Sequence, residues 1–309
     1  MKYVFGVDIG GTTVKMGLLS DEGKCLEKWE INTDKSNGGE KILPDVAASI
    51  EAKLKEKNIS KDDVIGVGAG VPGPVDSKGV VHKAVNLGWG TFDAAETLSK
   101  LTGLKAMVGN DANVAALGEM WLGGGIGYSD IVMVTLGTGV GGGIIIDGKI
   151  VNGSSGAGGE IGHMHMKDDE EKACGCGGHG CLEQYASATG ISRTASEKFA
   201  SWGRETVLTK DDLSAKAVFD GVKAGDELCR EIATEFGNVL GKGLAMIAAV
   251  VNPEAFVIGG GVSKAGEILL DYITPSFDKY AFSGSKNAKM VLATLGNDAG
   301  MYGAAKLVL

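Results

Sequence analysis

The chain has 309 residues and a formal net charge of −9, from 39 acidic and 30 basic side chains. This length suggests two domains, and a hydrophobic fraction of 44% is enough to build their cores. The acidic balance argues against nucleic acid or an anionic membrane as partner, and no run approaches the roughly 18 apolar residues of a membrane span. The start, Tyr3–Val7, reads as a buried strand and not as a signal peptide, so we expect a cytoplasmic protein.

Glycine and arginine occur in unusual amounts. The chain has 51 glycines but only 5 prolines, and the glycines cluster between apolar runs, as in tight turns that approach a ligand closely. The only arginines are Arg193, Arg204 and Arg230, and none of them lies in a glycine cluster. If the protein binds phosphates, backbone N–H groups and a metal ion must therefore supply most of the contacts.

The first third of the chain predicts strands joined by tight turns, followed by helices. Apolar residues at spacings of four mark the first helix, and a short aliphatic run after it is typical of a buried strand. The expected elements are strands Tyr3–Asp8, Val14–Ser20 and Lys24–Ile31, helix Glu40–Lys57, strands Val64–Gly70 and Ala106–Gly109, and a helix from Asn110 to about Trp121.

A second block begins at Ile131 and repeats the pattern of strand, Gly/Thr turn, strand and glycine-containing turn up to Lys149. We interpret this as an internal duplication with one hairpin per domain, although any two glycine-rich hairpins look alike. The rest is mostly helical. Its expected elements are helix Asp226–Val251, strand Ala255–Ile258, the turn Gly259–Gly261, a helix with Ser263 as N-cap, strand Met290–Ala293 and a terminal helix from Asp298.

The glycine turns indicate nucleotide binding. Backbone N–H groups and Thr hydroxyls can contact phosphate oxygens, and a nearby carboxylate can hold Mg²⁺ through water. No Lys-Ser/Thr follows the glycines, so neither hairpin turn is a Walker A loop, and the second turn lies between two strands, unlike a dinucleotide fingerprint. One such turn alone is most often a plain hairpin, but three clusters favour a nucleotide. The candidate residues are Asp8, Gly10, Gly11, Thr12, Thr13, Gly137, Thr138, Gly139, Gly259, Gly260 and Gly261.

Three of the five cysteines, Cys174, Cys176 and Cys181, fall within eight residues. A cytosolic protein rarely makes disulfides, so the cluster favours a metal site over a set of reduced thiols. With His163 as fourth ligand it predicts a tetrahedral Cys₃His zinc site with no open position, and hence a structural zinc. His165 and His179 are rival fourth ligands. The remaining cysteines, Cys25 and Cys229, are interpreted as ordinary thiols.

Several carboxylates lie beside these turns. Asp111 follows Asn110 at a strand-to-helix junction, where an N-cap is the simplest explanation. Glu160 precedes His163, and Glu183 follows the last clustered cysteine by two residues. Carboxylates can accept hydrogen bonds from sugar hydroxyls. Each alone is more often a solvated surface charge, but together they suggest a polyol substrate beside a nucleotide.

With these motifs the chain resembles the ROK family of repressors, open reading frames and kinases, and within that family the glucokinases of Gram-positive type. The resemblance covers essentially the whole chain, and the Glu-x-Gly-His motif followed by Cys-x-Cys-x₄-Cys is specific to the family. The matching stretches are Val7–Thr13, Gly70–Asp76, Ala84–Trp89, Asn110–Trp121, Val134–Ile146, Gly156–His163, Cys174–Glu183, Ile258–Gly266 and Leu295–Gly300.

The resemblance implies an α/β, two-domain, actin-like ATPase (ribonuclease H-like) fold with a cleft between the domains. The smaller domain would be residues 1–110 completed by a C-terminal helix at 296–309, and the larger would be residues 111–295 with the zinc loop. By resemblance, Asp111 is the general base. The implied sugar ligands are Asn110, Asp111, Glu160, His163 and Glu183, and the implied zinc ligands are His163, Cys174, Cys176 and Cys181. The two hairpin turns would flank the phosphates, and Gly259–Gly261 would approach the adenosine.

We therefore expect a kinase that transfers the γ-phosphoryl group of ATP to the 6-hydroxyl of glucose, with Mg²⁺, a structural zinc and a homodimeric or higher assembly. Alternatives are a kinase for N-acetylmannosamine, fructose or allose, and a sugar-sensing regulator without kinase activity. Regulators of this family carry a DNA-binding segment before the first strand, for which the residues before Asp8 leave no room. Polyphosphate in place of ATP is a further alternative.

Overall fold

The computed structural model describes residues 1–309, and the chain divides into two compact units. Unit 1 comprises Met1–Ser129, Gly143–Gly159 and Thr294–Leu309, and unit 2 comprises Asp130–Gly142 and Glu160–Ala293. Each unit therefore contains segments that are distant in the sequence, and the last residues of the chain belong with the first.

Unit 1 is built on a five-stranded sheet with the order β3-β2-β1-β4-β7. The hairpin strands β1, β2 and β3 pair antiparallel, whereas β4 and β7 add to β1 in parallel. The strands are β1 (Tyr3–Ile9), β2 (Thr13–Ser20), β3 (Cys25–Asn32), β4 (Val64–Val71) and β7 (Ala106–Asn110), and a small separate hairpin is formed by β5 (Val80–Val81) and β6 (Phe92–Asp93).

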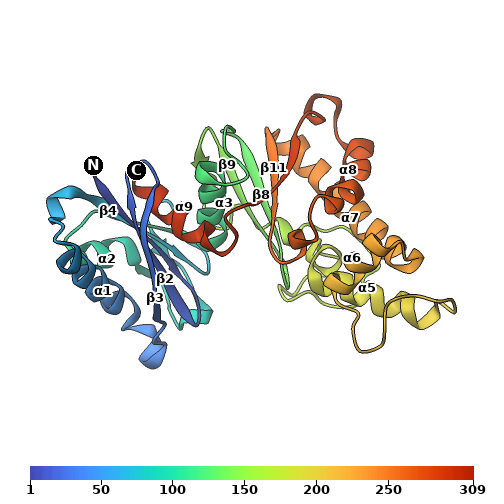
Figure 1. The fold of residues 1–309 in the computed structure, drawn as a ribbon, viewed down its shortest axis with the longest axis horizontal. Helices are drawn as coiled ribbons and strands as arrows, with labels where there is room; N and C mark the ends of the chain where they lie inside the picture. The colour runs from blue at the N-terminus through green and yellow to red at the C-terminus, as the bar shows by residue number, and fades with distance from the viewer. The chain divides into compact units, whose positions relative to one another are not determined.

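Helices cover both faces of this sheet (Figure 1). On one face α1 (Ile42–Lys57) and α2 (Ala94–Thr102) enclose a large core that includes Phe5 and Ile50. On the other face lie α3 (Asp111–Leu122) and α9 (Ala299–Val308), which pack closely on each other. The C-terminal helix thus joins the first strands in one unit.

The sheet associated with unit 2 has the order β10-β9-β8-β11-β12. Its parallel strands β8, β11 and β12 and its antiparallel β9–β10 pair occupy the same places as their counterparts in the first sheet. This shared order confirms the predicted duplication. The strands are β8 (Ile131–Leu136), β9 (Val140–Ile146), β10 (Lys149–Ile150), β11 (Ala255–Gly259) and β12 (Lys289–Leu292), and β9 spans a boundary between the units.

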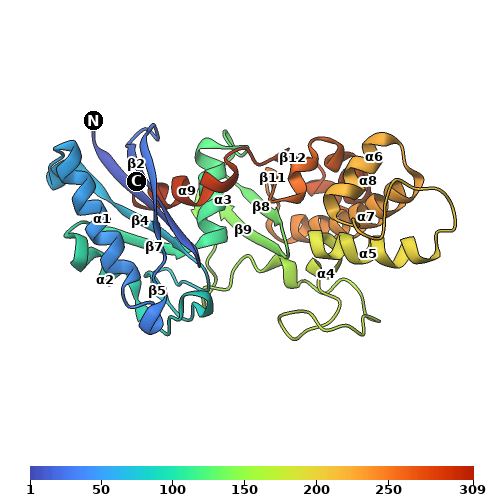
Figure 2. The same cartoon turned by 60° about the horizontal axis from the view of Figure 1, so that its bottom comes forward.

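Besides its strands, unit 2 consists of helices and a long loop before Glu183 that carries Cys174, Cys176 and Cys181 (Figure 2). Its helices are α4 (Glu183–Ala186), α5 (Ala188–Ser201), α6 (Ala215–Ala224), α7 (Glu227–Val251) and α8 (Ile268–Tyr280). By length and composition alone α7 could cross a membrane, with a mean hydropathy of 1.2 in its most apolar window. However, half of that window is buried, and α7 packs against α6 and α8. Phe236 stacks edge-on against Phe219 of α6, and Gly241 lies close to the backbone of Ile273 on α8. It is a core helix of unit 2.

Two expectations differ from the structure. The domain boundary was expected at residue 110, but α3 belongs to unit 1 because it packs on α9. Ser263 was expected to cap a helix, but it lies inside the short 3-10 helix Val262–Ala265 and donates to the carbonyl of Gly260 (2.8 Å). The next helix, α8, begins only at Ile268.

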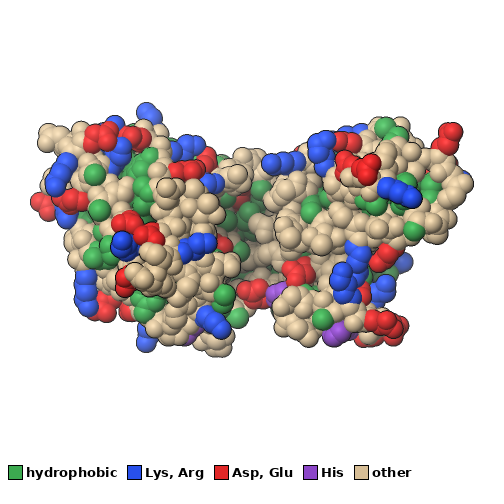
Figure 3. Space-filling view, turned by 90° about the horizontal axis from the view of Figure 1, so that it is seen from below, with side chains coloured by type: hydrophobic (Ala, Val, Ile, Leu, Met, Phe, Trp, Pro, Cys, Tyr) green, Lys and Arg blue, Asp and Glu red, His purple; other side chains and the backbone are tan.

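The surface of both units carries mixed charges. On the face drawn in Figure 3, acidic and basic side chains alternate over each unit. Exposed ion pairs such as Lys216–Asp220 (2.6 Å) are common, and each contributes little to stability because water screens it.

Candidate active site

Asp8 lies near the end of β1, with its carboxylate against the first turn of α9. A Cβ atom placed on Gly300 would lie 2.7 Å from Asp8 Cγ, so only glycine leaves room for this carboxylate. Burial and the neighbouring charge of Asp111 raise the pKa of Asp8 to about 6, while the charge of Lys15 acts in the opposite direction. Two carboxylates are therefore held together where a cation would relieve their repulsion.

Asn110 and Asp111 mark the junction of β7 and α3. The Asn110 Oδ1 atom accepts from the N–H groups of Ala112 (3.0 Å) and Asn113 (3.1 Å), so Asn110 is the N-cap. Its amide donates to the Gly73 carbonyl (3.1 Å) and to Asp111 Oδ1 (3.1 Å), and this oxygen also accepts from Ala112 N–H (2.8 Å). Because Asn110 fills the cap position, capping does not explain why Asp111 is an aspartate.

The turn between β1 and β2 is tight, and hydrogen bonds from Thr33 hold it in place. Gly10 N–H donates to the carbonyl of Thr13 (3.0 Å), which leaves Thr12 exposed at the tip. Thr33 donates its hydroxyl to the Gly10 carbonyl (2.7 Å) and its N–H to the Thr12 carbonyl (3.0 Å). The exposed backbone and hydroxyl groups of this turn are therefore held in fixed positions.

Lys15 is a basic side chain near the turn that the sequence reasoning missed. It pairs with Asp8 across the β1–β2 ladder, so both side chains lie on the same face of the sheet. Its Nζ atom donates to the Asn297 carbonyl (3.1 Å), just before α9. Strand alternation could have revealed this side chain, because the β1–β2 register follows from the length of the turn.

In unit 2 the turn Gly137–Gly139 contacts Glu183 at the start of α4. Gly137 N–H donates to the Gly139 carbonyl (3.0 Å), and Gly137 O accepts from Ala188 N–H (2.8 Å). A Cβ atom on Gly139 would lie 2.5 Å from Glu183 Oε2, and this oxygen also accepts weakly from Val140 N–H (3.4 Å). The turn and the Glu183 carboxylate are thus fixed relative to each other.

A cavity of about 550 Å³ opens beside Thr138 in unit 2. Gly261 and Val262 form one wall, and the start of α5 and one side of α6, including Phe219, form the others. Gly260 has a φ of +85°, and a Cβ atom there would meet the backbone of Leu136 at 2.6 Å, so this turn needs glycine. The volume suits a ligand of nucleoside size.

The residues of α5 and α6 that line this cavity were not found from the sequence. They are Ala188, Thr189, Ser192, Ser214, Ala215, Lys216, Phe219, Asp220 and Lys223. Each is an ordinary helix or loop residue in its own segment, so no local pattern distinguishes it.

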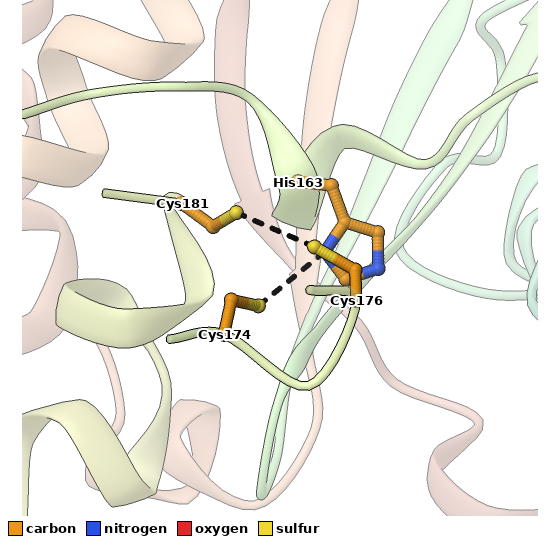
Figure 4. Close-up of side chains that lie close together, drawn as sticks. All are labelled: His163, Cys174, Cys176 and Cys181. Atoms are coloured by element: carbon orange, nitrogen blue, oxygen red, sulfur yellow. Dashed lines mark hydrogen bonds between the residues drawn. The ribbon is translucent and has the colours of Figure 1, made fainter. Parts of the chain in front are cut away.

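His163, Cys174, Cys176 and Cys181 converge on one centre in unit 2 (Figure 4). Their ligand atoms all lie within 4.8 Å of one another. Cys174 Sγ is 3.8 Å from His163 Nδ1, and the Cys176 and Cys181 sulfurs are 3.7 Å apart. Tetrahedral zinc with Zn–S bonds of about 2.3 Å separates its sulfur ligands by about 3.8 Å, so the four side chains fit this ion.

The rival histidines are engaged elsewhere. His165 Nδ1 lies 2.8 Å from the His179 carbonyl, and its Nε2 lies 2.9 Å from Asp168 Oδ1. His179 Nδ1 lies 2.9 Å from the Glu170 carbonyl. His163 is therefore the histidine that completes the cluster. Cys25 and Cys229 lie outside it, as expected.

Two of the carboxylates expected to bind sugar, Glu160 and Glu183, lie next to His163. Glu160 Oε2 lies 3.8 Å from His163 Nε2, and Glu183 Oε1 lies 3.7 Å from His163 Nδ1. Glu183 also accepts from the Cys174 thiol (2.9 Å), whose pKa is raised to about 12 mainly by burial. The Glu160 side chain is 58% exposed and can therefore reach a ligand in solvent.

Known proteins of one family are similar to this chain over nearly its whole length. The family model of the ROK family matches residues 4–309. A glucokinase of Halalkalibacterium halodurans is 43% identical over 99% of this chain and 95% of the relative, and one of Thermotoga maritima is 36% identical over 99% and 96%. The crystal structure of a ROK family glucokinase from Streptomyces griseus with glucose and AMPPNP superposes with a TM-score of 0.74, at 35% identity over 99% and 98% of the two chains.

The two duplicated sheets and these structural neighbours define the protein as a member of the actin-like ATPase fold class, which confirms the expected fold. More narrowly, the chain belongs to the ROK family, which the sequence resemblance had indicated.

Proposed function

We propose that the protein is an ATP-dependent glucokinase that phosphorylates the 6-hydroxyl of glucose. The glucokinase relatives at 43% and 36% identity over nearly the whole chain carry this proposal. The presence of Asp111 at the start of α3 and of Glu160, His163 and Glu183 around one loop supports it from the residues.

Asp111 is proposed as the general base. It accepts the proton of the sugar hydroxyl as that oxygen attacks the γ-phosphorus, and the hydrogen bonds from Asn110 and Ala112 N–H hold its Oδ1 atom in place. Asn110, Glu160, His163 and Glu183 are proposed as further sugar ligands. Carboxylate oxygens accept hydrogen bonds from hydroxyl groups, which suits a polyol.

Asp8 is the proposed anchor for Mg²⁺. Its raised pKa and the nearby charge of Asp111 fit a cation that binds at this end of β1. Bound Mg²⁺ would neutralise charge on the phosphates. Gly10–Thr13 and Gly137–Gly139 are proposed to contact the phosphates through N–H groups, and Lys15 adds one positive charge on the Asp8 side.

The 550 Å³ cavity is the proposed adenosine site, and Gly261 of the turn Gly259–Gly261 lies in its wall. The cluster of His163, Cys174, Cys176 and Cys181 is proposed to hold a structural zinc. All four ligand positions come from protein, so the ion would fix the loop that carries Glu160 and His163 without binding substrate.

A coupled kinase assay tests the proposal. Purified protein is assayed with glucose, N-acetylmannosamine, fructose and allose, each with ATP or polyphosphate. We expect the highest kcat/KM with glucose and ATP. A higher kcat/KM with another sugar would show that the protein is a kinase for that sugar. No turnover with any combination of sugar and phosphate donor would favour a sugar-sensing regulator without kinase activity. We also propose a homodimer in the cytoplasm, which sedimentation of the purified protein and cell fractionation would test.

A further inference from the structure

Glu119 is a buried carboxylate that the proposed chemistry does not use. It lies in the last turn of α3 and is 0% exposed. No Lys, Arg or His side chain forms an ion pair with it. A negative charge near a helix C-terminus is unfavourable because it meets the negative end of the helix dipole, and burial without a cation adds a further cost. Its position therefore needs another explanation.

Three backbone N–H groups satisfy this carboxylate. Oε2 accepts from Gly124 (2.8 Å) and Thr294 (3.0 Å), and Oε1 accepts from Leu295 (2.8 Å). The Glu119 carbonyl accepts from Gly123 (3.0 Å) and Gly125 (2.9 Å) as well. One residue thus holds the end of α3 to a segment that is about 175 residues further along the chain.

That segment leads directly to the phosphate side of the proposed site. The chain returns from unit 2 to unit 1 at Thr294. Asn297 follows and accepts from Lys15 Nζ (3.1 Å). Three residues later comes Gly300, where a Cβ atom would lie 2.7 Å from Asp8 Cγ. The positions of Lys15 and Asp8 therefore depend on where residues 294–300 lie.

We propose that Glu119 is a positioning residue for the Mg-nucleotide: its buried carboxylate fixes residues 294–300, and this segment fixes Lys15 and Asp8. The proposal rests on the proposed kinase function, because it assigns these two side chains to the phosphates and the metal. It does not involve Glu160, His163 or Glu183, which belong to unit 2. A defect at Glu119 should therefore affect the nucleotide more than the sugar.

The first test is Glu119→Gln. The amide has nearly the same shape, but it can present its oxygen to only one side, so its NH₂ group faces an N–H donor that is left unsatisfied. We expect KM for Mg-ATP to rise on the order of tenfold, with KM for glucose changed by less than about twofold. Hydrogen exchange at Thr294 and Leu295 should accelerate by at least a similar factor. As a control, Lys28→Met breaks the exposed Lys28–Asp298 pair on the same segment and should change neither KM.

A second pair of variants leaves Glu119 intact. Leu295 has a φ of −78°, which proline can adopt, so Leu295→Pro removes one N–H donor without forcing a new backbone angle at this residue. Leu295→Ala removes the side chain and keeps the donor. The proline variant should reproduce the rise in KM for Mg-ATP, and the alanine variant should not.

Equal effects on both KM values, or a loss of thermal stability alone, would show that Glu119 is only structural and would overturn the proposal. Rapid exchange of the Thr294 and Leu295 amides in the unmodified protein would also overturn it, whether or not Glu119→Gln folds. If the unmodified protein phosphorylates no sugar, the proposed function fails instead, while the exchange measurements still decide whether the carboxylate holds the segment.

Discussion

Gly300→Ala is expected to damage catalysis without a matching loss of stability. Gly300 is buried in the first turn of α9 and touches Asp8. In an ordinary helix position, Gly→Ala stabilises a protein by about 1 kcal/mol. Here the new methyl group would lie 2.7 Å from Asp8 Cγ and 2.8 Å from Oδ2, closer than real Cβ contacts.

The geometry sets the size of the effect. The Asp8 carboxylate must move by about 0.7 Å to reach an ordinary contact distance of 3.4 Å from the new Cβ atom. A displacement of about 1 Å at a reacting group can cost on the order of a hundredfold. We therefore expect kcat/KM for Mg-ATP to fall roughly ten- to hundredfold, while the free energy of unfolding changes by less than about 1 kcal/mol because helix propensity offsets the overlap.

The assay combines steady-state kinetics at several Mg²⁺ concentrations with thermal unfolding of the ligand-free protein. The matched control is Gly90→Ala, because a Cβ atom there meets nothing within 4 Å. The control should keep full activity. A Gly300→Ala variant with normal turnover and a normal Mg²⁺ requirement would refute the assignment of Asp8 to the metal.

Three further predictions concern Asp8, Asp111 and the cysteine cluster. The pKa of Asp8 is about 6 in the folded protein against 3.8 when unperturbed, so the metal-free protein should lose up to about 3 kcal/mol of unfolding free energy as pH rises from about 4 to 6. Urea unfolding of Asp8→Asn should lack this pH dependence, and the same pH dependence in Asp8→Asn would show that Asp8 does not cause it. Asp111→Asn should cut turnover by roughly 10²- to 10⁴-fold while weakening glucose binding less, as measured by kinetics and calorimetry, and near-normal turnover would remove Asp111 from the chemistry. Cys176→Ser should lower the zinc content from near one per chain and reduce sugar-dependent turnover more than binding of a nucleotide analogue. Normal turnover in zinc-free protein would contradict a structural role of zinc in sugar binding.

Local patterns in the sequence were sufficient for some features. The repeated hairpins could be read from strand and turn residues, and the structure confirms their duplication. Cys174, Cys176 and Cys181 are so close in the sequence that a short loop brings them together, and only the choice of histidine needed the structure. Asn110 and Asp111 likewise follow from one strand-to-helix junction.

Other features depend on segments that are far apart in the chain. The matching stretches include Gly300 and Glu119, but no local pattern indicates a role for either residue. Each acts through a partner from a distant segment, Asp8 for Gly300 and Thr294–Leu295 for Glu119. The cavity beside Thr138 has walls from separate segments of unit 2, and the assignment of α3 to unit 1 follows from its packing on α9. Spacing along a helix or strand reveals which side chains share a face, whereas the approach of two distant backbones is decided by packing of the whole unit.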